Sequence, residues 1–215
     1  MTLNRRTLLS TTGVFAISLG LMPFTGAGLA LAQDVDKEKL MTPGPLGEMA
    51  IGPDDAKVTI IEYASATCPH CARFHEGTFK ELKEKYVDTG KVRFVFREFP
   101  FDDLALAAFM LARCAPKEKY FPMIDVIFKE QKKWASRDAN PRDELFRIAK
   151  LAAFTKDSFN ACLKNEEVAK GILNVRQVGQ ELGVDSTPSF FVNGEKLSGN
   201  ANFAKFEELI TKHLN

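Results

Sequence analysis

The chain has 215 residues, of which 45% are hydrophobic and 27% are charged, and its formal net charge is +1. This composition is typical of a globular protein, and the length is enough for one sizeable core or two small ones. A net charge so close to zero argues against a general nucleic-acid binder, so we expect no nucleic-acid partner.

Residues 1–32 read as an export signal. Arg5 and Arg6 form a basic start, an apolar stretch follows over 8–31, and Ala-Leu-Ala at 30–32 is typical of a cleavage site. An uncleaved membrane anchor is the competing interpretation, which the interspersed glycine and proline residues disfavour. The paired arginines leave both the general secretory (Sec) and the twin-arginine route open. Export places a protein in an oxidising compartment, here expected to be the periplasm, and four cysteines fit such a location.

Residues 33–51 are polar at first and then rich in proline and glycine, so they predict a flexible lead-in. They lack a heptad pattern for coiled-coil assembly, and we expect a monomer.

A predicted strand over residues 57–64 leads into a C-x-x-C pair. Its side chains are mostly β-branched or aromatic, and apolar residues of both parities indicate a central strand covered on both faces. Cys68 follows where a helix is expected to begin, and Pro69 takes the first helical position, where a missing N–H is tolerated. The apolar face of that helix runs through Phe74, Phe79, Leu82 and Tyr86.

The two cysteines are predicted to differ in acidity. A thiol at a helix N-terminus meets the positive end of the helix dipole and unpaired N–H groups, which lowers the pKa of Cys68. His70 can add a positive charge or a hydrogen bond, whereas Cys71 lies one turn inside the helix and should be nearer an ordinary thiol. We therefore expect Cys68 to be the nucleophile and Cys71 the resolving thiol. Because a stabilised thiolate stabilises the reduced form, such a pair oxidises other thiols.

The remaining chain predicts a second strand, a helical block and a closing hairpin with a helix. The side chains of residues 91–99 alternate with the period of two that is typical of a strand. With the first strand and its helix, this strand is predicted to make a right-handed βαβ unit. Arg97 and Glu98 near its end are either a surface pair or groups that reach the dithiol. Residues 102–183 carry helical apolar faces, with a helix end at Gly183. Over 184–215, an Asn-Gly turn joins two short strands before a last helix.

Together these motifs resemble the DsbA-type thiol:disulfide oxidoreductases of the thioredoxin superfamily. The resemblance rests on Cys68-Pro69-His70-Cys71 after Glu62-Tyr63, with Thr187-Pro188 far downstream, and it covers roughly Pro45 to the C-terminus. It implies an α/β thioredoxin-like fold with an inserted all-helical domain. The thioredoxin-like domain would comprise residues 52–101 and 184–215, and the insert residues 102–183.

The resemblance also implies roles for residues outside the C-x-x-C pair. Glu62 matches a buried carboxylate that accepts the Cys71 proton; a strand-end residue turned to solvent is the alternative. Where the family often has an acid, four residues after the second cysteine, this chain has His75, which we expect on the helix surface. A cis-Pro188 would face the dithiol, and the backbone of Thr187 would bind an extended substrate and exclude metal from the cysteines.

Cys114 and Cys162 both fall in the helical block. If Cys68 pairs with Cys71, then Cys114 and Cys162 can pair only with each other. Some members of the resembled family carry such a second bridge. A structural disulfide is our expectation; two buried free thiols are the alternative.

The predicted function is an exported enzyme that passes its Cys68–Cys71 disulfide to reduced, unfolded exported proteins through a mixed disulfide on Cys68. The resemblance implies re-oxidation by a DsbB-like membrane partner, and no cofactor or resident metal is expected. Two alternatives stay open. A disulfide isomerase or reductase would use the same site. A Cu(I)- or Zn(II)-binding protein would use Cys68, His70 and Cys71, but the sequence offers no second ligand pair.

Overall fold

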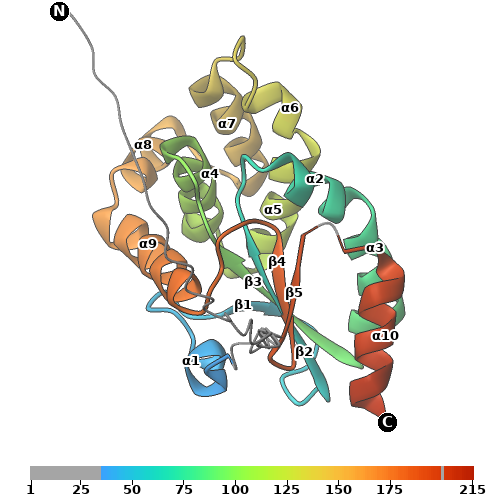
Figure 1. Ribbon diagram of the computed structural model, residues 1–215. Helices are drawn as coiled ribbons and strands as arrows, with labels where there is room; N and C mark the ends of the chain where they lie inside the picture. Colours follow the sequence, from blue (N-terminus) through green and yellow to red (C-terminus); the bar gives the residue numbers. More distant parts are fainter. Residues whose placement is uncertain (1–34, 200) are drawn as a thin grey trace, which may run out of the picture. The chain divides into compact units, whose positions relative to one another are not determined.

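The computed structural model of the protein describes residues 35–199 and 201–215 (Figure 1). The predicted export signal over 1–32 lies outside these ranges. Within them, no helix combines the length and apolar character that a bilayer crossing requires.

A five-stranded sheet in the order β1-β3-β2-β4-β5 forms the centre of the fold. The strands are β1 (Met49–Ile51), β2 (Val58–Ala64), β3 (Val92–Glu98), β4 (Ser189–Val192) and β5 (Glu195–Ser198). β2 and β3 run parallel, as the predicted βαβ unit requires, whereas the other neighbours pair antiparallel. The arrangement agrees with the predicted thioredoxin-like fold with a helical insert.

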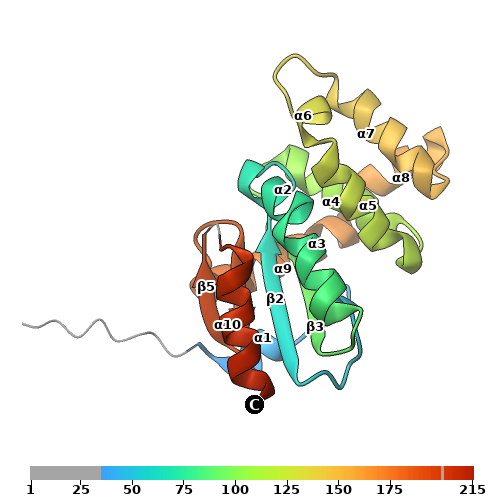
Figure 2. The same ribbon diagram turned by 90° about the vertical axis from the view of Figure 1, so that its right-hand side faces the viewer.

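Side chains of β2 alternate between two cores, one on each face of the sheet. Ile61 and Tyr63 pack with Leu40 and Val175 of the helices on one face, whereas Ile60 belongs to the larger core on the other. Figures 1 and 2 show α1 (Lys37–Met41) and α9 (Glu166–Glu181) on the first side, and α3 (Thr78–Leu82) and α10 (Phe203–Leu214) on the second. The apolar residues of both parities that predicted a doubly covered strand therefore serve two separate cores.

The helix that follows Cys68 is interrupted, although its apolar pattern predicted continuity. α2 (Pro69–Glu76) ends at Gly77, whose backbone angles (φ −121°, ψ −92°) are not helical. α3 then begins at Thr78, and a π-helical turn over Lys83–Val87 follows it.

The helical block begins after β3 and continues to α9. Its elements are α4 (Asp103–Cys114), α5 (Tyr120–Lys129), α6 (Gln131–Trp134), α7 (Pro141–Ala149), α8 (Lys156–Leu163) and α9, with short 3₁₀ turns at Lys117–Lys119 and Lys150–Ala152. Side chains of Asp102, Asn140 and Thr155 cap α4, α7 and α8 by accepting backbone N–H bonds. The chain breaks at Glu130, so residues 120–134 form two helices, α5 and α6.

The last helix of the predicted insert belongs to both parts of the protein. α9 packs against α4 and also against β3. A Cβ at Gly179 would lie only 2.7 Å from the Tyr63 ring, so the missing side chain lets α9 approach the sheet closely. The predicted insert, residues 102–183, therefore includes a helix that also covers the sheet.

The segment over residues 35–51 differs from the flexible lead-in that its composition predicted. It forms α1, capped by Asp36, and the edge strand β1, which pairs with β3. Leu40 and Met49 are buried. Burial of these few apolar side chains outweighs the glycine and proline content around them.

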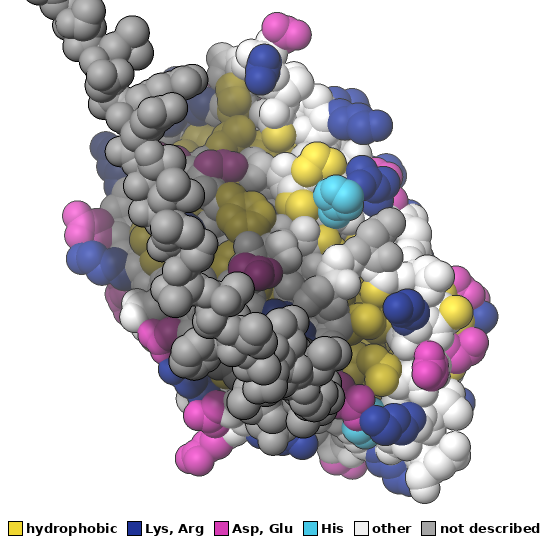
Figure 3. Space-filling view, in the orientation of Figure 1, with side chains coloured by type: hydrophobic (Ala, Val, Ile, Leu, Met, Phe, Trp, Pro, Cys, Tyr) yellow, Lys and Arg dark blue, Asp and Glu magenta, His cyan; other side chains and the backbone are white. Residues whose placement is uncertain are grey.

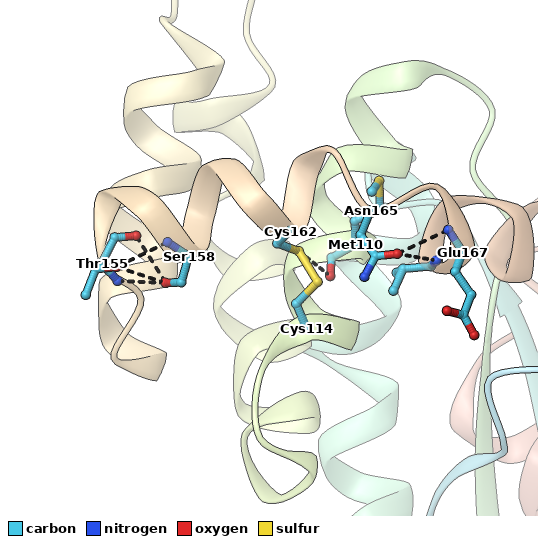
Figure 4. Close-up of a disulfide and its surroundings, with 8 residues drawn as sticks. Met110, Cys114, Thr155, Ser158, Cys162, Asn165 and Glu167 are labelled. Atoms are coloured by element: carbon cyan, nitrogen blue, oxygen red, sulfur yellow. Dashed lines mark hydrogen bonds between the residues drawn. A yellow bond between two sulfur atoms is a disulfide. The ribbon is translucent and has the colours of Figure 1, made fainter.

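A disulfide joins α4 to α8 (Figure 4). Cys114 and Cys162 are bonded, with their Cα atoms 6.1 Å apart. The Thr155–Ser158 capping box at the start of α8 and the Asn165 cap of α9 flank the bridge on either side. A bridge that closes a loop of 48 residues stabilises the folded state by at most about 4 kcal/mol on the chain-entropy account.

Candidate active site

The C-x-x-C cysteines lie at the junction of β2 and α2. The Cys68 N–H donates to the Ser65 carbonyl oxygen at 3.0 Å, and this turn places Cys68 at the N-cap of α2. Pro69 holds the first helical position. Both thiols are free; Cys71 is wholly buried, whereas Cys68 exposes 9% of its surface. A substrate can therefore reach one sulfur and not the other.

Cys68 is the acidic thiol of the pair. Its pKa is lowered from 9.0 to about 5, chiefly by the hydrogen bond with the Cys71 thiol. Burial opposes this shift, and hydrogen bonding with Thr187 and with the backbone N–H groups of Cys71 and His70 supports it. These N–H groups are donors that the first turn of a helix leaves unpaired. At neutral pH the Cys68 sulfur is therefore a thiolate.

Cys71 has the opposite character. Burial, above all, raises its pKa well above 9.0, and the hydrogen bond to Cys68 and the negative charge of Glu62 act in the same direction. The reduced pair therefore holds one proton, and it holds it on Cys71.

The Thr187–Pro188 loop lies against Cys68. The peptide bond between these residues is cis, and the Cys68 Sγ lies 3.3 Å from the Thr187 carbonyl oxygen. β4 begins at the next residue, Ser189, and pairs with Tyr63 of β2. The strand that leads to the dithiol thus also fixes the loop opposite it, which brings together residues 119 positions apart in sequence.

Glu62 and His75 form a buried pair on the side of the sheet that faces the larger core. Glu62 is fully buried, so the alternative prediction that it is a strand-end residue turned to solvent is wrong. The surface position expected for His75 is also wrong, because its side chain is only 3% exposed and its Nε2 lies 2.8 Å from Glu62 Oε2. His75 follows the buried Cys71 by four residues, and that helical spacing places both on one face. This signal was present in the sequence.

The Glu62 carboxyl is prepared to carry a proton. Burial raises its pKa, an effect that the neighbouring His75 moderates and the Cys68 charge reinforces. One carboxyl oxygen, Oε2, meets His75, whereas the buried Oε1 has no partner among the described residues.

The His70 imidazole has a different partner from the one expected. Its Nδ1 lies 2.8 Å from Arg73 Nη2 on the exposed side of α2. His70 contributes to the low pKa of Cys68 through its backbone N–H instead. The imidazole ring itself is therefore expected to affect the pKa of Cys68 little, because its contact is with Arg73 on the exposed side of α2.

Arg97 and Glu98 are neither a surface pair nor bonded to the dithiol. Arg97 donates to Glu48 at 2.9 Å and to the Tyr63 hydroxyl at 2.8 Å, on one face of the sheet. Glu98 pairs with Arg113 of α4 on the other face. The alternation of a β-strand sends the two neighbours to opposite sides.

Gln131 also contacts the site, and no sequence pattern indicated this contact. From α6 in the helical block, its Nε2 donates to the carbonyl oxygens of Ala66 and Cys68 at 2.7 and 3.0 Å. The helical block therefore holds the backbone of the active-site turn directly. A single glutamine 63 residues beyond Cys68 carries no local signal of such a contact.

The acidity of Cys68 gives a direct prediction. We expect the ultraviolet absorbance of the thiolate in the reduced protein to rise with a midpoint at about pH 5. Because the folded-state pKa is depressed, the stabilisation of the folded reduced form is fully present above the ordinary thiol value of 9.0 and is lost as the pH falls through about 5. Cys71→Ala removes the largest contribution, so its midpoint should rise clearly; His70→Ala keeps the backbone N–H and should shift less. A midpoint like that of a free cysteine in the unmodified protein would contradict the assignment.

Charge is mixed on the face of the described residues that Figure 3 shows. Basic and acidic side chains are interspersed over the face drawn in Figure 3. Among the residues that the structure describes, no three His, Cys, Asp or Glu side chains come together in a way that could hold a metal ion.

Known proteins share both the fold and the sequence of this chain. The family model described as "Thioredoxin" matches residues 46–212. The crystal structure of alpha-DsbA1 from Wolbachia pipientis is similar with a TM-score of 0.75 and 33% identity, over 82% of this chain and 94% of that one. A protein of Rickettsia bellii named "Putative protein-disulfide oxidoreductase" is 36% identical over 173 residues, which are 78% of this chain.

A third relative comes from Bacillus cereus. Its "Probable disulfide bond formation protein D" is 29% identical over 177 residues, which are 78% of this chain and 79% of that protein. By contrast, the match spans only 66% of the length of the Rickettsia relative. The chain belongs to the thioredoxin superfamily, as a member of its DsbA-type group.

Proposed function

We propose that this chain is an exported thiol:disulfide oxidoreductase that donates its Cys68–Cys71 disulfide to reduced, partly unfolded secreted proteins. The proposal rests on the difference in pKa between the two thiols. A pKa of about 5 for Cys68 means that reduction produces a stable thiolate, whereas the disulfide gains nothing from that stabilisation. Reduction of the enzyme is therefore favoured, and the enzyme oxidises its partner.

The exchange proceeds in two steps at Cys68. A substrate thiolate attacks the Cys68 sulfur, the Cys68–Cys71 bond breaks, and Cys71 leaves with the electron pair and takes a proton from the Glu62 carboxyl. A second substrate thiolate then attacks the substrate sulfur of the mixed disulfide and releases the Cys68 thiolate. The substrate loses two electrons and the enzyme pair gains them. The low pKa of Cys68 makes it a good leaving group in the second step.

The loop before β4 would hold the substrate. The Thr187 carbonyl oxygen lies 3.3 Å from the Cys68 Sγ. An extended peptide that pairs with the Thr187 backbone would bring its cysteine to Cys68, in the manner of an added strand. Pro188 fixes this backbone and itself offers no N–H donor.

The predicted export signal and the DsbA-type group support a location and partners for the protein. We place the mature protein in the periplasm as a monomer, exported by the Sec or the twin-arginine route. A DsbB-like membrane protein would re-oxidise Cys68 and Cys71, and the chemistry of the pair requires no cofactor.

A glutathione redox titration tests the direction of the reaction. We expect a reduction potential near the value of about −120 mV typical of strong oxidants, far above the value of about −270 mV typical of thioredoxin. A potential near the latter value would assign the same site to a reductase. A potential near about −180 mV would favour an isomerase.

A further inference from the structure

The buried acid at the site has one polar contact that leads away from the cysteines. Glu62 is fully buried, and its Oε2 lies 2.8 Å from His75 Nε2. The negative charge of Glu62 helps to raise the pKa of Cys71, after burial and the hydrogen bond to Cys68. A carboxyl that gives a proton to Cys71 must recover it from solvent, and Glu62 has no exposed surface through which to do so.

Aromatic side chains enclose the His75 ring on several sides. The ring stacks on Phe128 of α5 with centroids 4.4 Å apart, and it contacts Phe79 at 4.8 Å and Phe96 at 5.7 Å. These rings come from three different elements, so they fix the imidazole plane and exclude water from its faces. The orientation toward Glu62 is therefore set by packing.

His75 also lines a cavity that reaches the surface between α3 and α5. The cavity has a volume of about 260 Å³, and Phe79 and Phe121 form part of its wall. Its lining also includes Lys80, Lys83 and Asp125, all of which are exposed. The space is large enough to hold several water molecules. His75 thus bonds the buried carboxyl through Nε2 and also borders an open cavity.

We propose that His75 is a proton relay that connects Glu62 to solvent through the cavity between α3 and α5. The relay rests on the proposed function, in which Glu62 exchanges a proton with Cys71. When Cys71 leaves as a thiolate, it takes the Glu62 proton; Glu62 takes the proton from His75 Nε2, and Nδ1 accepts one from cavity water. Re-oxidation reverses each transfer, so no net charge remains buried.

Imidazole is suited to this task because it can gain a proton at one nitrogen while it loses one at the other. The charged and titratable groups around the relay are Glu62 on β2, the two cysteines at α2, Tyr120 and Asp125 of α5, and Lys80 and Lys83 beside the cavity. The surface groups meet the cavity mouth, whereas Glu62 is the partner within hydrogen-bond distance of His75.

Kinetics of the oxidised protein with reduced glutathione test the relay. His75→Gln keeps an amide that can bond Glu62 but cannot pass a proton on. We expect its rates of reduction and re-oxidation to fall together by about 100-fold, the lower end of the range of general acid–base catalysis. The reduction potential should change little, because a relay acts equally on both directions. A matched control is His213→Gln, which removes the imidazole of a partly exposed pair with Glu195 (3.0 Å) and should leave both rates unchanged.

Chemical rescue separates a relay from a packing role. In His75→Ala, added imidazole should restore the rates through the cavity, whereas pyrazole, which is similar in size but far less basic, should not. The relay is refuted if His75→Gln keeps the rates of the unmodified protein, or if imidazole restores no more than pyrazole does. Failure of the proposed oxidase function would appear separately, as a low potential of the unmodified protein.

Discussion

The Cys68→Ala variant is expected to lose all detectable oxidation of a reduced model protein. Cys71 remains in this variant, but it is wholly buried and its pKa is raised well above 9.0, so it offers neither access nor a thiolate. In the proposed exchange the substrate attacks the Cys68 sulfur, which is also the leaving group of the second step, and no other described free cysteine can replace it. Recovery of activity in a reduced, denatured ribonuclease reports the loss.

Cys71→Ala is the matched variant for that experiment. It keeps the accessible Cys68 sulfur and removes the thiol that resolves a mixed disulfide. We expect it to accumulate a stable adduct with oxidised glutathione, visible by mass spectrometry, whereas Cys68→Ala should form none. Adducts on Cys71 in the Cys68→Ala variant would reverse the assignment of the two roles.

Arg113→Met is expected to lower the free energy of unfolding by about 3–5 kcal/mol, because it leaves a buried carboxylate without its cation. The Glu98 side chain is fully buried, and Arg113 Nη2 donates to Glu98 Oε2 at 2.8 Å. Arg113 also donates to the carbonyl oxygens of Leu46 and Gly47, which precede β1. The pair therefore ties the helical block and the N-terminal segment to β3. Urea denaturation of the variant measures the loss.

A double variant separates the charge from the packing. Glu98→Gln together with Arg113→Met removes both charges, and the new amide oxygen can still accept from the Tyr120 hydroxyl. We expect this double variant to lose clearly less stability than Arg113→Met alone. Equal losses would mean that the cost of Arg113→Met lies in its contacts with Leu46 and Gly47 and not in the unpaired Glu98.

Features encoded within a few residues could be predicted from the sequence. The strand into Cys68 and the proline at the first helical position follow from local rules, and so does the Asn193-Gly194 hairpin, whose residues both have positive φ. The same holds for the helix caps at Asp102, Asn140 and Thr155. The acidity of Cys68 belongs here in part, because the N–H groups that lower its pKa are its own neighbours in the helix.

Long-range contacts decided what the sequence left open. Glu62 of β2 and His75 of α2 meet although 13 positions separate them, and Gln131 reaches Cys68 from a different helix. The lead-in forms α1 and β1 because β3 supplies an edge and the core accepts Leu40. Local propensity acts over one turn or one strand, whereas burial and electrostatic pairing depend on residues tens of positions away. The sequence by itself therefore determined which of the two cysteines is expected to be the acidic one, because that depends on its own helix, and the tertiary structure decided which groups lie around the pair.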